Sequence, residues 1–381
     1  MLSQRGAARA MSATPAQAGD EILSVRNLHT HFLTYAGVVK ALNGFDLQVR
    51  RAEMSALVGE SGSGKSVAAW SFLGLPKAPG RIVQGEVQWH GQDILRMSKE
   101  RLKQLRGNQI SLILSSPRSN LHPLLRVGDQ IQAVHQAHHQ VPRSQARETT
   151  LAMLKAVGLD PRRIFDAYPH ELSGGMAQRI IIAAALINSP ELVIADDATN
   201  GLDVTVQRQV LDLMTRLIQQ RRSSTLMITH DLGIVAQYCS RATVMYAGQA
   251  VEVASTKPLF NNPLHPYTQA LIGAIRSKAA VQRKSLPGLP PDPMALPTGC
   301  FLHPRCPVRR PECAQVRPTL RQVEHGHWVR CILYPEKEET APAEEAGFVA
   351  NTRDGGEETN AHDSEGLVGE MRSRSSGERG T

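Results

Sequence analysis

The chain of 381 residues lacks an apolar run long enough to cross a membrane. Its longest such run, Ile180 to Ile187, has eight residues, whereas a transmembrane helix needs about twenty. The first twenty residues carry Arg5 and Arg9 but no apolar core of the kind found in a secretory signal. We therefore expect a disordered lead-in over residues 1–20, and we expect any membrane role to be peripheral.

Cysteine is scarce, and acidic charge does not dominate. Five cysteines are an odd number in a chain without an export signal, which disfavours a disulfide framework and favours metal ligands or free thiols. The net charge of +8 would suit nucleic acid or an anionic membrane surface, but the arginines are scattered, which favours a solvated basic surface. With 41% hydrophobic residues, the chain has enough apolar material for two domains, the larger with a substantial core.

Residues 59–66 read GESGSGKS and fit the phosphate-binding pattern G-x-x-x-x-G-K-[ST] at every fixed position. An apolar strand-like run precedes them, and a helical pattern follows, so the glycines lie at a strand-to-helix turn. Backbone N–H groups and the helix N-terminus can hold phosphates there. We assign nucleotide binding to the loop residues Gly59, Ser61, Gly62, Ser63 and Gly64, with Lys65 reaching the β- and γ-phosphates and Ser66 ligating Mg²⁺.

The rest of the pattern predicts an α/β fold of the P-loop NTPase, RecA-like type. Strand-like runs at 22–25 and 44–49 predict an antiparallel β edge, and residues 95–187 predict a mainly helical subdomain with helices at 99–105, 127–139 and 144–157. Parallel strands are expected at 191–195 and 224–228, with a helix at 205–221 between them, followed by a hairpin over 244–253. Together these elements predict one nucleotide-binding domain over residues 21–275.

Composition changes after about Arg276, where five prolines crowd residues 287–297 and exclude helix or central strand. We place a domain boundary there and expect a small Pro/Cys-rich C-terminal domain over 276–335. Residues 336–381 are rich in Glu, Gly and Ser and should form a disordered acidic tail. The tail's negative charge leaves the remainder of the chain more strongly basic.

Two further residues stand where a nucleotidase needs them. Asp196 ends an apolar strand roughly 130 residues after the P-loop, the position of the carboxylate that orients Mg²⁺ through water. His230 follows the next predicted strand and can hydrogen-bond a γ-phosphate. A strand-end aspartate alone is often a turn residue, but its combination with the P-loop and His230 favours the catalytic interpretation.

Residues 172–179, LSGGMAQR, resemble the signature loop of ABC ATPases. The resemblance implies that Ser173, Gly174 and Gly175 contact the ATP of a second subunit in a head-to-tail dimer, and that Asp203 belongs to the D-loop that follows. It also implies that Tyr35 stacks on adenine, with Phe32 as an alternative. P-loop, signature, aspartate strand, D-loop and histidine occur in the order of that family, over roughly residues 22–335.

Residues 263–268, PLHPYT, and four C-terminal cysteines resemble hallmarks of the ATP-binding subunits of oligopeptide, dipeptide and nickel importers. The spacing C-x5-C-x6-C-x17-C of Cys300, Cys306, Cys313 and Cys331 does not match the paired spacing of zinc ribbons. On spacing alone, an iron–sulfur cluster, zinc and reduced thiols stay equally open. The resemblance implies a [4Fe–4S] cluster. Cys239, far away in sequence, is interpreted as a buried apolar residue.

Two positions depart from the family pattern. Ser115 follows the strand-like run 110–114, where the family has a Gln that contacts Mg²⁺ and senses the membrane subunits. Asp197 follows Asp196, where the family has the Glu that polarises the attacking water. We therefore expect this subunit's own ATP site to hydrolyse slowly, and the assembly to be a heterodimer in which Asp197, His230 and Ser115 form the altered catalytic set.

The resemblance implies a transport function. It predicts an ATPase on the cytoplasmic face of the cell (inner) membrane that uses ATP and Mg²⁺ to drive uptake of peptides or similar solutes. Its partners would be a second ABC subunit, two transmembrane permease subunits and, indirectly, a solute-binding protein, with no nucleic acid. The alternative is a non-transport ABC ATPase acting on nucleic acid or ribosomes, which the net charge permits. Because such proteins usually carry two cassettes and this chain has one P-loop, transport is preferred.

Overall fold

A computed structural model describes residues 21–276 and 286–334. One of its two sheets is antiparallel, with strand order β2-β1-β4-β5. Its strands are β1 (Glu21–Thr34), β2 (Gly37–Arg50), β4 (Gly80–Trp89) and β5 (Gln92–Asp93). This sheet is the predicted antiparallel edge, but β1 and β2 are much longer than expected, and β4 was missed.

The second sheet has eight strands in the order β11-β12-β10-β9-β3-β8-β7-β6. Its parallel part comprises β3 (Met54–Val58), β8 (Ser224–Thr229), β7 (Leu192–Asp196) and β6 (Ile110–Ile113), with β9 (Arg241–Tyr246) also parallel to β3. Strands β10 (Gln249–Ser255), β12 (His327–Val329) and β11 (Arg321–Glu324) extend it by antiparallel pairing. Continuous apolar runs suit the parallel strands because both of their faces are buried.

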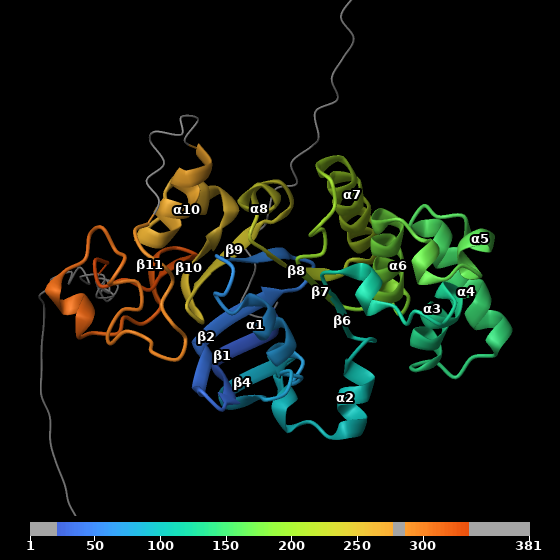
Figure 1. Cartoon of the computed structure of the whole chain (residues 1–381), viewed down its shortest axis with the longest axis horizontal. Coiled ribbons are helices and arrows are strands. Elements are labelled where there is room, and N and C mark those ends of the chain that lie inside the picture. The colour runs from blue at the N-terminus through green and yellow to red at the C-terminus, as the bar shows by residue number, and fades with distance from the viewer. Residues whose placement is uncertain (1–20, 277–285, 335–381) are drawn as a thin grey trace, which may run out of the picture. The chain divides into compact units, whose positions relative to one another are not determined.

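The helices fall into groups that Figure 1 separates clearly. Helices α3, α4, α5 and α6 lie together beyond β6 and form the predicted helical subdomain, whereas α1 lies by the antiparallel sheet. The α-helices are α1 (Lys65–Phe72), α2 (Lys99–Leu105), α3 (Val127–Gln136), α4 (Arg143–Ala156), α5 (Pro161–Phe165), α6 (Gly174–Leu186), α7 (Val204–Arg221), α8 (Leu232–Tyr238), α9 (Thr256–Asn261) and α10 (Pro266–Arg276). Short 3-10 turns are η1 (Ile94–Arg96), η2 (Pro117–Asn120), η3 (Pro169–Glu171) and η5 (Pro311–Ala314).

The core lies on both faces of the eight-stranded sheet. Strand β3 shows this directly, because Ala56 and Val58 pack into one apolar cluster while Leu57 packs into the other. On the second face, α1 packs on the antiparallel sheet, with the Phe72 and Phe45 rings stacked at 6.1 Å between centroids. Helix α1, and with it the P-loop at its start, is therefore held between two sheets.

The C-terminal cysteine segment shares the core sheet, since β12 pairs with β10 through Glu252–Val329 and Val253–Trp328. The limits of the predicted domains stay a prediction. The expectations for residues 1–20 and 336–381 lie outside the described residues, as do 277–285 of the proposed C-terminal domain. Within the part of the chain that the structure describes, no helix is both long and apolar enough to span a membrane.

Candidate functional site

The P-loop lies between the end of β3 and the start of α1, and two of its glycines allow close backbone approach. A Cβ on Gly59 would collide with the carbonyl oxygen of Met245, and one on Gly64 would lie 2.6 Å from that of Ala41. Gly64 also has φ 106°, which L side chains rarely adopt. Side chains at these positions would thus push the loop out of its place between β2 and β9.

The loop presents unpaired donors at the N-terminus of α1. The first N–H groups of a helix have no partner within it, and Gly64, the N-cap residue, supplies no side-chain cap. The Ser63 hydroxyl is buried and has no hydrogen-bond partner among the described residues. A polyphosphate fits this arrangement, because it would accept hydrogen bonds from these groups and from the helix N-terminus.

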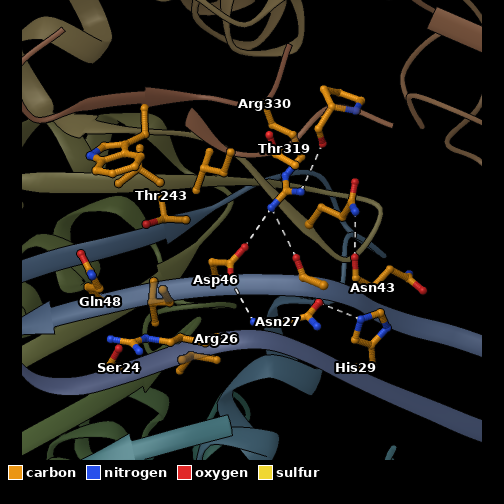
Figure 2. A pocket seen from close by; sticks show the side chains of 18 of the residues that line it. Ser24, Arg26, Asn27, His29, Asn43, Asp46, Gln48, Thr243, Thr319 and Arg330 are labelled. Carbon is orange, nitrogen blue, oxygen red and sulfur yellow. Dashed lines mark hydrogen bonds and ion pairs between the residues drawn. The ribbon is translucent and has the colours of Figure 1, made fainter. Parts of the chain in front are cut away.

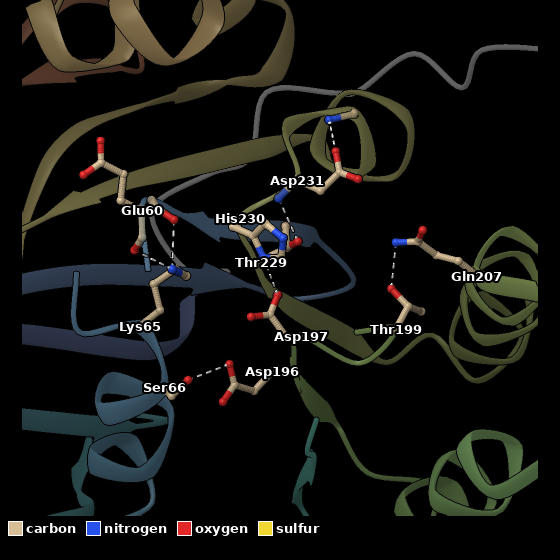
Figure 3. A network of polar contacts seen from close by, with 12 residues as sticks. Glu60, Lys65, Ser66, Asp196, Asp197, Thr199, Gln207, Thr229, His230 and Asp231 are labelled. Carbon is tan, nitrogen blue, oxygen red and sulfur yellow. Dashed lines mark hydrogen bonds and ion pairs between the residues drawn. The ribbon is translucent and has the colours of Figure 1, made fainter. Parts of the chain in front are cut away.

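Lys65 is 7% exposed, and its ammonium donates to the carbonyl oxygens of Gly59 at 2.8 Å and Glu60 at 2.9 Å (Figure 3). Burial lowers the pKa of Lys65, and the carboxylates of Asp197, Asp196 and Glu60 oppose that shift. The side chain is thus held inside the loop by two neutral acceptors. A phosphate would replace them with a charged acceptor, which makes a stronger bond.

Asp196, the last residue of β7, faces Ser66, the second residue of α1. The Ser66 hydroxyl donates to Asp196 Oδ1 at 3.1 Å. Burial raises the pKa of Asp196, the Ser66 hydrogen bond lowers it, and neighbouring Asp197 raises it further. Hydroxyl and carboxylate oxygens are the ligands Mg²⁺ prefers, and a cation here would favour the ionised form of Asp196. Ser66 and Asp196 therefore lie together, and their joint role as Mg²⁺ ligands stays a prediction.

Asp197 and His230 meet beside this pair. His230 Nδ1 lies 3.3 Å from Asp197 Oδ1 (Figure 3). The His230 side chain is exposed, and that of Asp197 is half-buried. They line a polar cavity of about 220 Å³ together with Thr199 and Thr229. The structure thus brings the P-loop, Asp196, Asp197 and His230 to the carboxyl ends of β3, β7 and β8, as the sequence order indicated.

The signature residues lie at the start of α6. Ser173 is its N-cap, and the Ser173 Oγ accepts from the N–H of Met176 at 3.3 Å. A Cβ on Gly175 would lie 2.8 Å from Val206 of α7. Asp203 caps α7 by accepting from the N–H of Val206 at 3.0 Å. The signature and the D-loop are therefore packed together, and no hydrogen bond among the described residues joins the signature to the P-loop.

Ser115 and Tyr35 stay predictions as site residues. Ser115 follows β6, and its carbonyl accepts from the Asn120 amide at 2.8 Å. Tyr35 lies fully exposed at the turn between β1 and β2, free to stack on a base. Phe32, the alternative, is half-buried, and its ring lies so close to Gly80 that a Cβ there would sit 2.8 Å from it. Tyr35 is the more accessible of the two aromatics.

All four C-terminal cysteines are free and line one small cavity, with His265 and His303 nearby. Burial raises the pKa of Cys300 to about 11, and burial also raises the pKa of Cys306 and of Cys331. Even so, among residues 21–276 and 286–334 no group of three or more His, Cys, Asp or Glu side chains is arranged to hold a metal ion. Cys239 is buried, as expected, and burial raises its pKa to about 12.

Sequence reasoning missed how the C-terminal segment contacts the P-loop. The hydroxyl of Tyr267 accepts the N–H of Glu60 at 2.9 Å, and Arg305 pairs with the Glu60 carboxylate at 3.3 Å. The carbonyl of Pro293 accepts the N–H of Lys40 at 2.9 Å, beside the hairpin that carries Tyr35. Tyr267 belongs to the PLHPYT motif, which was the available signal for the first contact.

Two family models match the chain. Residues 42–200 match the model described as ABC transporter, which includes the P-loop, the signature and Asp196. Residues 251–313 match the model described as Oligopeptide/dipeptide transporter, C-terminal region, which includes Tyr267, Arg305 and three of the four cysteines. The first match covers the P-loop, the signature and Asp196 but not Tyr35, Asp203 or His230, and the second covers the segment that contacts the P-loop.

Curated relatives match over most of their length. The chain is 43% identical to the probable peptide ABC transporter ATP-binding protein y4tR of Sinorhizobium fredii, over 82% of this chain and 95% of that protein. It is 40% identical to the dipeptide transport ATP-binding protein DppD of Bacillus subtilis, over 84% and 97%. It is 38% identical to DppD of Escherichia coli, over 81% and 96%.

Solved structures agree on the fold. The dimeric structure of MJ0796, a bacterial ABC transporter cassette, superposes with a TM-score of 0.55 at 24% identity, covering 61% of this chain and 98% of that one. The structure of cbiO1 from Clostridium perfringens gives 0.54 at 25% identity, covering 64% and 92%. The P-loop ABC fold and the family resemblance are confirmed, and the chain belongs to the ABC ATPases, as an ATP-binding subunit of the oligopeptide/dipeptide/nickel importer family.

Proposed function

We propose that this subunit couples ATP binding and hydrolysis to the uptake of peptides or similar solutes through separate membrane subunits. The observation that carries the proposal is the P-loop with its facing Ser66–Asp196 pair, in a chain whose C-terminal part contacts that same loop. The names of the relatives, which are peptide and dipeptide transport proteins, support the substrate class. They favour transport over the rival role on nucleic acid or ribosomes.

Different residues of the site bind different parts of MgATP. The P-loop N–H groups and Lys65 bind the phosphates, Ser66 and Asp196 hold Mg²⁺, and exposed Tyr35 stacks on the adenine. Mg²⁺ held by Ser66 and Asp196 would supply positive charge that offsets the charge of the phosphates. His230 donates to the γ-phosphate and, through Asp197, keeps the attacking water near it.

Signature residues act on a different ATP molecule. Ser173 is exposed at the N-terminus of α6, Gly174 and Gly175 beside it are half-buried, and none of the three is hydrogen-bonded to this chain's P-loop among the described residues. In a head-to-tail dimer they complete the partner subunit's site with a hydroxyl and backbone N–H groups. ATP binding then closes the two subunits, and the closure is passed to the permeases as a two-state change.

The segment from Ser115 to Ile131 provides the contact with the permeases. Within it, Leu124 is 79% exposed and Leu125 is 49% exposed, side by side after η2. Two neighbouring exposed leucines match the apolar core of a small interface. The subunit would thus sit on the cytoplasmic face of the cell membrane, bound to two permeases that a solute-binding protein supplies with cargo.

The altered residues make this subunit's own site slow. Asp197 is one methylene shorter than the family's Glu, and Ser115 lacks the reach of the family's Gln. The intact signature serves the partner's site, so the partner is a different ABC subunit with a complete Walker set, and the assembly is a heterodimer.

A [4Fe–4S] cluster on Cys300, Cys306, Cys313 and Cys331 remains part of the proposal on the chemistry of four free thiols around one cavity. The lack of a ready metal-ligating group among the described residues counts against it. Anaerobically purified protein with iron and sulfide near four per chain would support the cluster. Colourless protein with one zinc would overturn it.

Reconstitution with the permease subunits of a peptide importer tests the function. ATP-dependent peptide uptake into vesicles should require this subunit, and Leu124→Glu should abolish uptake while the purified subunit keeps its ATP affinity. Val83→Glu, at a 54% exposed position on β4, is the matched control and should transport normally. Uptake that is unaffected by Leu124→Glu contradicts the docking segment, and binding of RNA in place of permeases contradicts the function.

A further inference from the structure

A cavity of about 590 Å³ lies away from the nucleotide site, between the antiparallel sheet and the C-terminal hairpin. Its floor comes from β1 and β2, and its opposite wall comes from β9, β10, β12 and residues 317–320 (Figure 2). No P-loop residue lines it. Ligand pockets commonly have volumes of about 300–1,000 Å³, so this one can enclose a small organic molecule.

Polar side chains of β1 and β2 line this side of the antiparallel sheet, and Arg26 and Gln48 among them are exposed. Ser24 and Arg26 alternate on β1, and Asp46 and Gln48 alternate on β2, so that they point to the same face (Figure 2). On β9, Arg241 is 9% exposed and Thr243 is 4% exposed, and both line the cavity. The strands therefore place polar groups around a space that the core does not fill.

One ion pair in the cavity is already complete. Arg330 donates to Asp46 Oδ2 at 2.9 Å and to the carbonyl oxygen of Ala250 at 2.8 Å, while Asp46 Oδ1 accepts the N–H of Asn27 at 2.9 Å (Figure 2). Asp46 is the one carboxylate among the residues that line the cavity, which also include Arg26, Arg241 and Arg317. With Asp46 paired to Arg330, three further arginines remain in the lining, of which Arg241 is buried whereas Arg26 and Arg317 are exposed to solvent.

Arg241 is the buried charged side chain of the cavity that lacks a partner among the described residues. Its Nη1 is buried without a hydrogen bond, and it makes no ion pair with any described residue. Burial lowers the pKa of Arg241, and the charges of Glu53 and Glu21 offset this only in part. The Ser24 hydroxyl, which lines the same cavity, is also buried and unpartnered. An arginine stays charged in proteins, and leaving such a charge buried and unpaired is costly.

Apolar side chains complete the wall. Half-buried Trp328 of β12 lines the cavity with Leu320 and Val253. A few polar groups set among apolar and aromatic ones are typical of small-molecule sites. We propose that this cavity binds a small organic anion, whose carboxylate or phosphate pairs with Arg241 and Ser24 and whose apolar part packs on Trp328.

Tryptophan fluorescence reports binding, because Trp328 lines the cavity whereas the chain's other two tryptophans, Trp70 and Trp89, do not. The probes are N-acetyl-phenylalanine and phenyl phosphate, with N-acetyl-phenylalaninamide as the uncharged analogue and inorganic phosphate as the anion without an apolar part. The full-length protein should show saturable fluorescence change with one of the two organic anions, and the preferred one identifies the anionic group. Both analogues should bind at least about tenfold more weakly, because each lacks one of the two contacts.

Arg241→Met should weaken binding by about tenfold to a hundredfold, and Ser24→Ala should weaken it by less. Arg101→Met, at an exposed position on α2, is the matched control and should bind normally. Saturating MgATP should leave probe affinity unchanged, and ATP affinity in Arg241→Met verifies that the variant is folded. If Arg241→Met fails to fold, the probe affinity of Ser24→Ala tests the proposal instead. Absence of saturable binding, normal affinity in the folded variants, or competition by MgATP overturns the proposal.

Discussion

Replacing Asp197 and Ser173 separately in the assembled transporter measures the asymmetry of its two ATP sites. Asp197→Asn removes the carboxylate from this chain's own site, whereas Ser173→Arg places a long cation where the signature faces the partner's ATP. If this chain's own site is slow, as proposed, Asp197→Asn should leave most of the ATPase activity. If the partner's site is the active one, Ser173→Arg should abolish it.

The magnitude follows from how the backbone at Asp197 is held. Its N–H donates to the carbonyl of Ile228 at 2.9 Å, and its carbonyl accepts from the N–H of Asn200 at 2.9 Å. With both groups bonded, and with φ at 43°, the residue cannot move toward the phosphate to replace the missing methylene. A shortfall of about 1 Å can cost on the order of 10²-fold in rate, or about 2.7 kcal/mol of barrier.

The assay is steady-state ATP hydrolysis by the reconstituted complex. Asp197→Asn should lower the total rate by less than about twofold, because a site slowed about 10²-fold contributes little to the total. Ser98→Arg is the matched control for Ser173→Arg, since Ser98 is likewise an exposed N-cap serine, on α2. It should retain activity. Loss of activity in Asp197→Asn together with retention in Ser173→Arg would refute the asymmetric scheme.

Three further predictions concern binding and stability. Lys65→Ala should weaken ATP binding by about 1.5–3 kcal/mol in a nucleotide titration, Lys99→Ala being the exposed control; unchanged affinity would contradict the assignment of Lys65. Tyr267→Phe leaves the Glu60 N–H without its acceptor and should lower the free energy of unfolding by about 1–3 kcal/mol; equal urea midpoints for the variant and the wild type would show that this bond is not important. Burial lowers the pKa of His265 from 6.5 to about 4, so between these pH values the unfolded chain takes up a proton that the folded chain does not. The free energy of unfolding should therefore decrease by on the order of 3 kcal/mol as the pH falls from 6.5 to about 4. An equal pH dependence of stability in His265→Gln would contradict this origin.

Much of the parallel core and the nucleotide site followed from the sequence because their signals are local. The P-loop, β7 with Asp196 at its end, and α7 each carry their pattern within fewer than twenty residues. Strand β4 was missed for the opposite reason. Gly85 interrupts it at φ 104°, and its side chains are mostly half-buried or exposed rather than alternating clearly. Its long partner is β1, whose matching residues lie from 48 positions earlier (Phe32 for Gly80) to 66 positions earlier (Leu23 for Trp89).

The P-loop contacts of the C-terminal segment were beyond sequence reasoning because they join residues far apart. Tyr267 is 207 positions from Glu60, and Arg305 is 245 positions from it. The PLHPYT pattern could be recognised as a hallmark, but no periodicity or spacing says that its tyrosine hydroxyl accepts a P-loop N–H. Nor does composition reveal that Arg241 of β9 faces a cavity, since a lone arginine in an apolar strand is not a signal for a ligand.

These contacts give the C-terminal segment a physical role in the ATP site. Arg305 lies between Cys300 and Cys306 in the chain, and its guanidinium reaches both the Glu60 carboxylate and the Tyr246 hydroxyl at 3.3 Å. Glu60 in turn supplies one of the two carbonyls that hold Lys65. Any change that moves the backbone between these two cysteines therefore shifts Arg305, and through Glu60 it alters the acceptors that position the phosphate-binding lysine. This chain of polar contacts links the cysteine segment to the P-loop.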